Sequence, residues 1–99
     1  MMKIDASHIK STVSPREFYR VELPGMPVPR RRNGWTSGGL CPFHDDHHAG
    51  NFRINLDTGA FHCFACGARG GDIVAFTQAR HGLTFPDAVA AIAGEWGIR

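Results

Sequence analysis

The chain of 99 residues has no long hydrophobic run and only three cysteines. No apolar stretch approaches the roughly 20 residues of a membrane-spanning helix, and no charged-then-apolar leader opens the chain. An odd number of cysteines that ends in a C-x-x-C pair fits metal binding better than the disulfide framework of a secreted protein. We therefore expect a soluble, cytoplasmic protein with no membrane contact and a single small core.

A strong positive charge is also missing. The formal net charge is +2. Residues 1–40 hold seven basic and three acidic side chains, whereas residues 41–99 hold four basic and six acidic ones, a balance of 4 − 6 = −2. Attraction to a polyanion must therefore depend on where individual cations lie, and not on bulk charge.

Two pairs of metal-binding residues are separated by 18 residues. The first pair is in Cys41-Pro42-Phe43-His44 and the second is in Cys63-Phe64-Ala65-Cys66. A gap of two residues lets one tight turn direct two side chains at the same ion, and two such knuckles supply the four ligands of tetrahedral zinc. We predict one structural Zn²⁺ held by Cys41, His44, Cys63 and Cys66.

The remaining histidines near this pattern compete less well for the ion. His62 adjoins Cys63 on an expected strand, where neighbouring side chains point to opposite faces, so it should face away from the metal. His47 and His48 lie in a polar loop that would have to rearrange before either became a ligand. Since four protein ligands leave no open position for water, the site is expected to be structural and not catalytic.

No catalytic constellation accompanies the metal pattern. A zinc deaminase requires H-x-E and P-C-x-x-C, and the chain contains neither. The stretch from Gly67 to Gly71 lacks the lysine of a phosphate-binding loop. Asp45 and Asp46 are interpreted as solvated loop carboxylates. We expect that the chain is not an enzyme on its own.

Residues 1–32 are expected to form an N-terminal part outside the ribbon. Its first 13 residues are interpreted as an irregular arm. Ser14 is a helix cap followed by proline, and the helix must end by Glu22 because Pro24 and Gly25 follow. The connector beyond them ends in the basic run Arg30-Arg31-Arg32.

Residues 33–99 are expected to form a zinc-ribbon domain with C-terminal helices. Alternation over residues 51–56 and a turn signal at Asp57-Thr58-Gly59 predict an antiparallel hairpin between the two knuckles. Helices are predicted after the caps Asp72 and Thr84. The fold class is thus small α+β, a ribbon with an antiparallel sheet flanked by one N-terminal and two C-terminal helices. The apolar sides of these helices are expected to include Phe18, Val21, Phe85, Val89 and Ile92.

The hairpin region also carries candidates for nucleic-acid contacts, namely Asn51, Arg53, Phe61, His62 and Phe64. Rings beside cations suit single strands, because bases stack on the rings while the cations contact phosphates. In the alternative interpretation, the phenylalanines are core residues that shield the metal. Strand alternation requires at least one of Phe61 and His62 to face outward.

Two further phosphate-binding candidates lie outside the hairpin. Arg69 comes shortly after the second knuckle and is the best isolated candidate for a phosphate contact. Arg30, Arg31 and Arg32 form a basic tip on the connector, for which a solvated charged turn is the alternative.

Taken together, these motifs resemble the zinc-binding domain of bacterial DnaG-type DNA primases. The resemblance covers residues 33–98 well and the N-terminal helix loosely. It rests on the two knuckles and on further stretches, which are Phe52, Phe61 to Ala68, Gly70 to Phe76, Phe85 to Val89, and Trp96 to Ile98.

The resemblance implies that the ribbon binds single-stranded template DNA in primer synthesis. The ligands of one structural zinc ion would be Cys41, His44, Cys63 and Cys66. The template-facing sheet would lie around Arg53 and His62. In that family a separate polymerase core of the TOPRIM type performs nucleotidyl transfer, and such a core or another replication protein would act in cis or in trans.

The chain departs from the family pattern in two ways. The loop after His44 is one residue longer and lacks the usual lysine and proline. The catalytic core is absent, so the chain is expected to be either a domain of a longer prokaryotic primase or a stand-alone protein of a phage, plasmid or other mobile element.

Two other functions stay open. The acidic balance after residue 40 favours a module that docks another protein without contacting nucleic acid. A small DNA-binding regulator that uses Arg30, Arg31 and Arg32 is disfavoured, because no recognition-helix arrangement is visible in the sequence.

Overall fold

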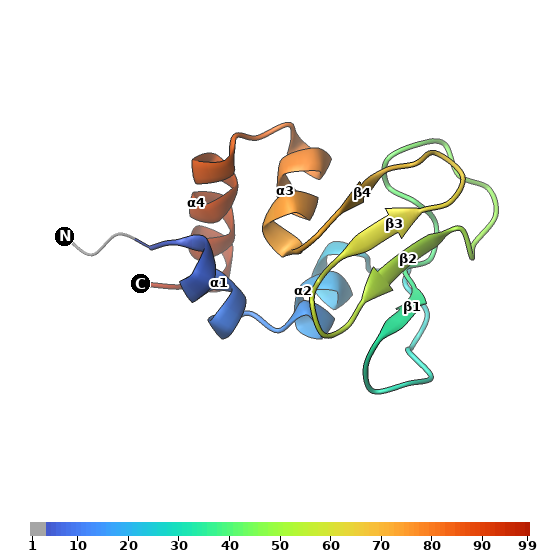
Figure 1. The fold of residues 1–99 in the computed structure, drawn as a ribbon, viewed down its shortest axis with the longest axis horizontal. Helices are drawn as coiled ribbons and strands as arrows, with labels where there is room; N and C mark the ends of the chain where they lie inside the picture. The colour runs from blue at the N-terminus through green and yellow to red at the C-terminus, as the bar shows by residue number, and fades with distance from the viewer. Residues whose placement is uncertain (1–3) are drawn as a thin grey trace.

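A sheet of four short strands makes up one side of the molecule, and helices make up the other (Figure 1). The computed structural model describes residues 4–99. The strands are β1 (Trp35–Ser37), β2 (Phe52–Asn55), β3 (Phe61–Cys63) and β4 (Arg69–Gly70). The helices are α1 (Ala6–Thr12), α2 (Pro15–Glu22), α3 (Ile73–His81) and α4 (Phe85–Trp96). None of the helices in this described range is long and apolar enough to cross a membrane.

The small α+β class and the antiparallel sheet of the ribbon are confirmed. Neighbouring strands are all antiparallel and follow the order β1-β2-β3-β4. Helix α2 lies behind the sheet, α3 follows β4, and α1 and α4 pack together at the end farthest from the sheet (Figure 1). The helices therefore cover one face of the sheet and leave the other face uncovered.

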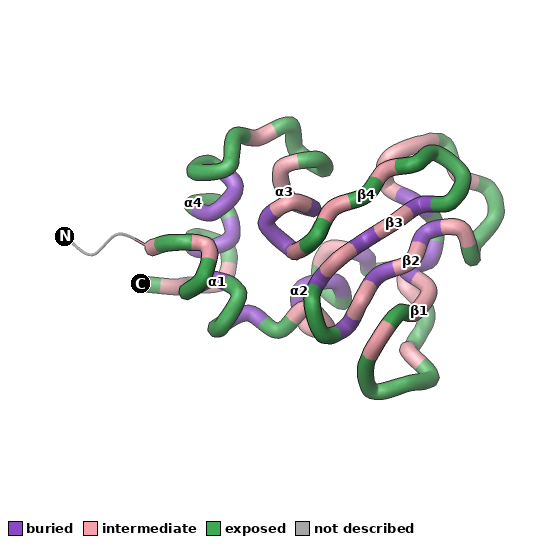
Figure 2. Tube along the Cα trace, viewed as in Figure 1, coloured by how far each residue is buried: buried purple, intermediate pink, exposed green. Residues whose placement is uncertain are grey.

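Alternation along the hairpin divides its side chains between these two faces. Phe52, Ile54, Phe61 and Cys63 are at most 1% exposed and lie on the inner face of the sheet. The residues between them are half-buried and point away, so buried and partly exposed positions alternate along β2 and β3 (Figure 2). This is the pattern of a half-buried strand that the sequence predicted.

The predicted helix boundaries follow from local capping chemistry. The side chains of Ser14, Asp72 and Thr84 each accept the backbone N–H three residues further along the chain. Helix α3 ends at Gly82, whose φ of 65° lies in the left-handed region that glycine adopts without strain. Each cap satisfies an N–H group that the first turn of a helix leaves unpaired.

The expectation of an irregular arm over residues 1–13 is wrong for the part that the structure describes. Helix α1 occupies Ala6–Thr12, with the Asp5 side chain accepting the N–H of His8 as its cap. Its only buried residue is Ile9. A helix of seven residues with one buried side chain has no periodic pattern for a sequence to reveal.

Two apolar side chains are also misplaced by the sequence analysis, because Val21 and Phe85 are each 51% exposed. In α2 the core positions belong to Phe18 and Tyr19. Phe85 stands at the first position of α4, before the buried stripe that starts at Ala88. The two-residue strand β4 was not expected either, since it is too short to show alternation.

An aromatic cluster joins the helices to the inner face of the sheet. Phe76 of α3 packs edge-on against Phe18 and Tyr19 of α2, with ring centroids 5.8 Å and 5.0 Å away. Phe61 of β3 packs edge-on against Phe76 at 5.4 Å. Phe43, within the first knuckle, stacks on Phe61 at 5.4 Å. The loop with the first pair of metal ligands is thus anchored in the same core as the helices.

One buried hydrogen bond connects α2 to the tip of the hairpin. The hydroxyl of Tyr19, a residue with no exposed surface, donates to the carbonyl oxygen of Gly59 at 2.6 Å. Gly59 has a φ of 80° in the hairpin turn. Burial, followed by the negative charge of Asp72, raises the pKa of Tyr19 above its usual range, so the hydroxyl remains a donor.

Removing this hydroxyl should destabilise the fold. The Tyr19→Phe variant leaves the buried Gly59 carbonyl without its partner, and we expect a loss of about 1–3 kcal/mol in unfolding free energy, measured by urea denaturation of the zinc-loaded protein. Val21→Ala on the exposed side of the same helix is the control and should change stability by less than about 0.5 kcal/mol. Equal stability of the two variants would contradict the assigned role of the bond.

Candidate metal centre and nucleic-acid interface

The two knuckles meet at one point beside the sheet. The ligand atoms of Cys41, His44, Cys63 and Cys66 all lie within 4.8 Å of one another. The Sγ atoms of Cys41 and Cys66 are 3.8 Å apart. In a tetrahedron with zinc–sulfur bonds of about 2.3 Å, two sulfur atoms are separated by about 3.8 Å, so the observed spacing matches zinc coordination.

The imidazole of His44 gives a second, independent sign of a metal. Its Nδ1 atom is buried and has no hydrogen-bond partner among the described residues. Buried polar atoms without a partner are rare and costly in folded proteins. A metal ion bound to this nitrogen would supply the missing partner. Three thiols and one imidazole are also the donor set that selects zinc over magnesium or calcium.

Electrostatics at the thiols explain why the cluster needs a cation. Burial raises the pKa of Cys41 to about 12, although the Phe43 N–H is directed at its sulfur at 3.4 Å. Burial is the largest single effect on Cys63 and opposes its ionisation, but the N–H groups of Cys66 and Ala65 and the thiols of Cys66 and Cys41 together lower the pKa of Cys63. A divalent ion would stabilise the thiolate form of every cysteine in the cluster.

Asp46 belongs to the first knuckle, and its interpretation as a solvated carboxylate is wrong. Its side chain is only 5% exposed. Oδ2 accepts the N–H of Cys41 at 2.7 Å, and Oδ1 accepts the N–H of His48 at 3.2 Å. These two N–H groups, that of Cys41 first, lower the pKa of Asp46 and keep it ionised. By contrast, Asp45 is 92% exposed, as expected.

The same carboxylate lies beside the second ligand of the knuckle. Oδ1 of Asp46 is 3.7 Å from Nε2 of His44, the ring nitrogen opposite the unpaired Nδ1. Metal-bound histidines commonly turn their other nitrogen toward a carboxylate, which fixes the tautomer and the ring orientation. Asp46 thus contacts the backbone of one predicted ligand and approaches the ring of the other.

The remaining histidines lie outside the metal cluster. Nε2 of His47 is 3.3 Å from a carboxylate oxygen of Asp45 in the exposed loop. His62 projects from the uncovered side of the sheet and stacks on Phe64, with ring centroids 4.5 Å apart and planes at 25°. None of His47, His48 and His62 is part of the four-residue group.

Most of the predicted nucleic-acid contacts share the uncovered side of the sheet, which we call the outer face. Arg53 of β2 pairs with His62 of β3, and His62 pairs with Arg69 of β4, so the three side chains form a row across the strands. Phe64 beside this row is 71% exposed. A groove of about 210 Å³ is lined by Arg53, His62, Phe64 and the indole of Trp35.

One hairpin residue has another role than the sequence analysis gave it, and the predicted contact of Asn51 stays a prediction. The assignment of Phe61 to the nucleic-acid surface is wrong, because its side chain is 1% exposed and packs against the helices. Asn51 is half-buried, and its backbone carbonyl accepts the N–H of Phe64 at 2.9 Å. The sequence analysis did not decide whether Phe61 or Phe64 lies on the surface. In the structure Phe64 is the ring on the outer face.

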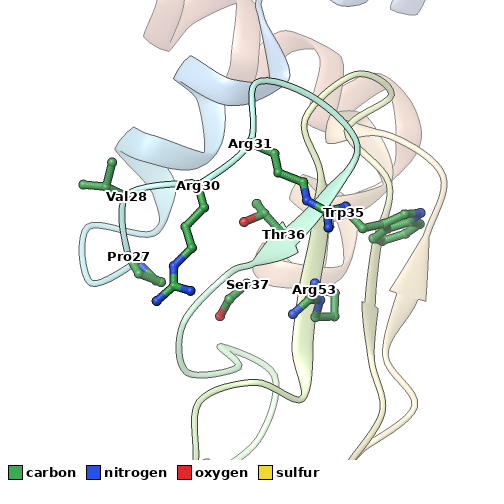
Figure 3. A pocket seen from close by; sticks show the side chains of 8 residues that line it. All are labelled: Pro27, Val28, Arg30, Arg31, Trp35, Thr36, Ser37 and Arg53. Carbon is green, nitrogen blue, oxygen red and sulfur yellow. The ribbon is translucent and has the colours of Figure 1, made fainter.

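The basic connector reaches the same side of the molecule. Arg30 and Arg31 line a cavity of about 430 Å³ together with Trp35 and Arg53 (Figure 3). Arg32 does not line it, and its backbone carbonyl accepts a hydrogen bond from Arg16. Trp35 lines both this cavity and the groove on the outer face, and the sequence analysis gave it no functional role. The only feature of the sequence that could have indicated a surface role for Trp35 is a large aromatic residue within a run rich in glycine and serine.

Two knuckles that bring three cysteines and one histidine together beside an antiparallel sheet have the architecture of a zinc ribbon. Residues 17–99 match the CHC2 zinc finger of the DnaG zinc-ribbon family, and the chain belongs to that family. The predicted family resemblance is thereby confirmed.

Curated relatives of the chain are bacterial DNA primases. The chain is 43% identical over 84 residues to the DNA primase of Mycolicibacterium smegmatis, which is 83% of this chain and 13% of that protein. It is 42% identical over 69 residues to the enzyme of Streptomyces coelicolor, covering 70% of this chain and 10% of the relative. It is 37% identical over 73 residues to the DNA primase of Enterococcus faecalis, which is 74% of this chain and 11% of that protein. The chain thus spans about a tenth of the length of these relatives.

The role of Asp46 can be tested without altering a predicted ligand. Asp46→Asn removes the negative charge beside His44 and one acceptor of the Cys41 N–H, so we expect zinc affinity to fall about 10–100-fold in a chelator competition assay. Asp45→Asn, next to it but exposed, is the matched control and should bind zinc like the unaltered protein. If the two variants hold zinc equally well, Asp46 does not orient the site.

Proposed function

We propose that this chain is a structural zinc module that binds single-stranded template DNA during primer synthesis, together with a polymerase core supplied in cis or in trans. The observation that carries the proposal is the row of Arg53, His62 and Arg69 on the outer face, next to exposed aromatic rings. Membership of the CHC2 zinc finger family and the primase relatives support the same function.

The composition of the outer face suits single strands better than duplex DNA. Trp35 and Phe64 are 46% and 71% exposed, although rings of this size are usually buried in a small domain. Unpaired bases can stack on such rings, whereas the bases of a duplex are already stacked on each other. The guanidinium groups of Arg53 and Arg69 are placed to contact the phosphates that connect those bases.

The metal acts in this function through rigidity and not through chemistry. Cys63, a predicted ligand, directly follows His62 in β3, and Cys66 lies between Phe64 and Arg69. An ion that fixes the two cysteines therefore fixes the backbone from which the interface side chains project. A closed shell of four protein ligands leaves nucleotidyl transfer to the polymerase core.

Docking of another protein without nucleic acid is the alternative function. It gives no role to a row of cations flanked by exposed rings, and protein interfaces are in general depleted of charge at their centre. The outer face therefore favours the nucleic-acid function, and replication proteins enter the proposal as partners that bind elsewhere on the domain.

Substitution of Arg53 should weaken binding without disturbing the fold. For Arg53→Ala we expect about tenfold weaker binding of a labelled single-stranded oligonucleotide, measured by fluorescence anisotropy at several salt concentrations. Loss of one phosphate contact should also reduce the slope of log K against log salt by about 0.7. Zinc content and circular dichroism should be unchanged, because the side chain projects from the outer face.

Arg80→Ala, an exposed cation on α3 outside the sheet, controls for the change in net charge and should bind the oligonucleotide normally. Salt-independent binding, or no binding by the unaltered chain with or without a primase core, would contradict the proposed function. Equal binding by the Arg53 and Arg80 variants would show that the outer face is not the contact surface.

A further inference from the structure

Three arginines surround one cavity at the junction of the connector and the sheet. We call it the connector cavity and define it by Arg30, Arg31, Trp35, Thr36, Ser37 and Arg53. Figure 3 shows Arg31 reaching from the connector toward the strand that carries Trp35, whereas Arg30 extends along the connector side of the cavity near Pro27. Its volume is about 430 Å³, which falls within the range of small-molecule sites.

The charge of this cavity is uncompensated by the protein. Within residues 4–99, no carboxylate lies within 4.0 Å of the guanidinium groups of Arg30, Arg31 and Arg53. An arginine does not lose its proton at neutral pH, so the cavity gathers about three positive charges. Thr36 and Ser37 also line the cavity, and each carries a hydroxyl group.

The connector that carries two of these arginines is held in place. Nη2 of Arg16 in α2 donates to the carbonyl oxygens of Arg31 at 3.2 Å and of Arg32 at 2.6 Å. Pro27 and Pro29 further restrict the backbone just before it, because proline fixes φ. The cavity is therefore formed before a ligand arrives, and little ordering of the chain opposes binding.

We propose that the connector cavity binds the 5′-polyphosphate of a nucleotide, with its base against the indole of Trp35. An internal phosphodiester brings only one negative charge. A nucleoside triphosphate carries roughly −3.5 to −4 near neutral pH, since its terminal phosphate alone contributes about −1.5 to −2. Arginine also pairs with phosphate oxygens through two parallel hydrogen bonds, and three guanidinium groups spread over one cavity find enough phosphate oxygens only on a polyphosphate.

This site is separate from the single-strand contact but adjoins it. The connector cavity shares Trp35 and Arg53 with the groove on the outer face. Two sources offer the same chemistry, a free nucleoside triphosphate and the 5′-triphosphate end of an RNA strand. The inference goes beyond template binding, because neither source is a template strand.

Calorimetric titration of the zinc-loaded chain tests the proposal. Adenosine, AMP, ADP, ATP and inorganic tripolyphosphate are compared in Mg²⁺-free buffer. We expect at least a tenfold gain in affinity from AMP to ATP, and weaker binding of tripolyphosphate, which lacks a base. Arg30→Gln/Arg31→Gln should weaken ATP binding at least tenfold with zinc content unchanged, and Arg80→Gln is the matched control. Arg16→Gln should also weaken ATP binding, because it releases the connector.

A short RNA with a 5′-triphosphate, and the same RNA with a 5′-hydroxyl, distinguish the two sources. Tighter binding of the triphosphorylated RNA than of free ATP assigns the site to a strand end, and the opposite order assigns it to a free nucleotide. Equal affinity for AMP and ATP, or no effect of the double substitution on ATP, would overturn the proposal.

The outcome is distinguishable from failure of the proposed function. Binding of 5′-hydroxyl single-stranded DNA and its loss in Arg53→Ala test the template contact alone. If the double substitution weakens only that DNA and not ATP, then Arg30 and Arg31 belong to the template path and the polyphosphate site does not exist.

Discussion

The meeting of Cys41, His44, Cys63 and Cys66 at one point, where a metal ion would bind all four, is the constraint on which the rest of the structure depends. The segment between β1 and β2, residues 38–51, contains no helix or strand. It is fixed instead by its two predicted ligands, by the carboxylate of Asp46 and by the ring of Phe43 in the core. Zinc binding to small modules contributes on the order of 10 kcal/mol, which equals the whole stability of a typical domain. In a chain of 99 residues the ion and the aromatic cluster therefore have to act together.

The hairpin places its core side chains and the side chains of the proposed DNA contact on opposite faces of two strands. Phe52, Ile54 and Phe61 face the helices and hold the domain together, whereas Arg53 and His62, one residue away from them, face outward. A period of two allows the same short strands to serve both purposes. It also means that a shift of one residue in register would bury the cations and expose the core. The two knuckles at the ends of the hairpin oppose such a shift, because each predicted ligand has to reach the same point.

The parts of the molecule that the sequence predicted correctly depend on neighbours within a few residues. The caps at Ser14, Asp72 and Thr84 and the alternation of the hairpin are of this kind. What escaped prediction depends on contacts made across the fold or on elements too short to have a pattern. The choice between Phe61 and Phe64 required the strand pairing, and the cavity around Trp35 required the bond from Arg16 to a carbonyl 15 residues along the chain. Helix α1 buries one residue, Ile9, so its sequence shows no helical periodicity of apolar residues.

X-ray absorption at the zinc edge, on the purified folded protein, tests the central claim most directly. The account predicts one zinc per chain with three sulfur neighbours at about 2.3 Å and one nitrogen at about 2.0 Å. Removal of that zinc by a chelator should abolish the folded signal in circular dichroism. A shell of nitrogen and oxygen alone, or a stably folded chain without stoichiometric zinc, would contradict the account.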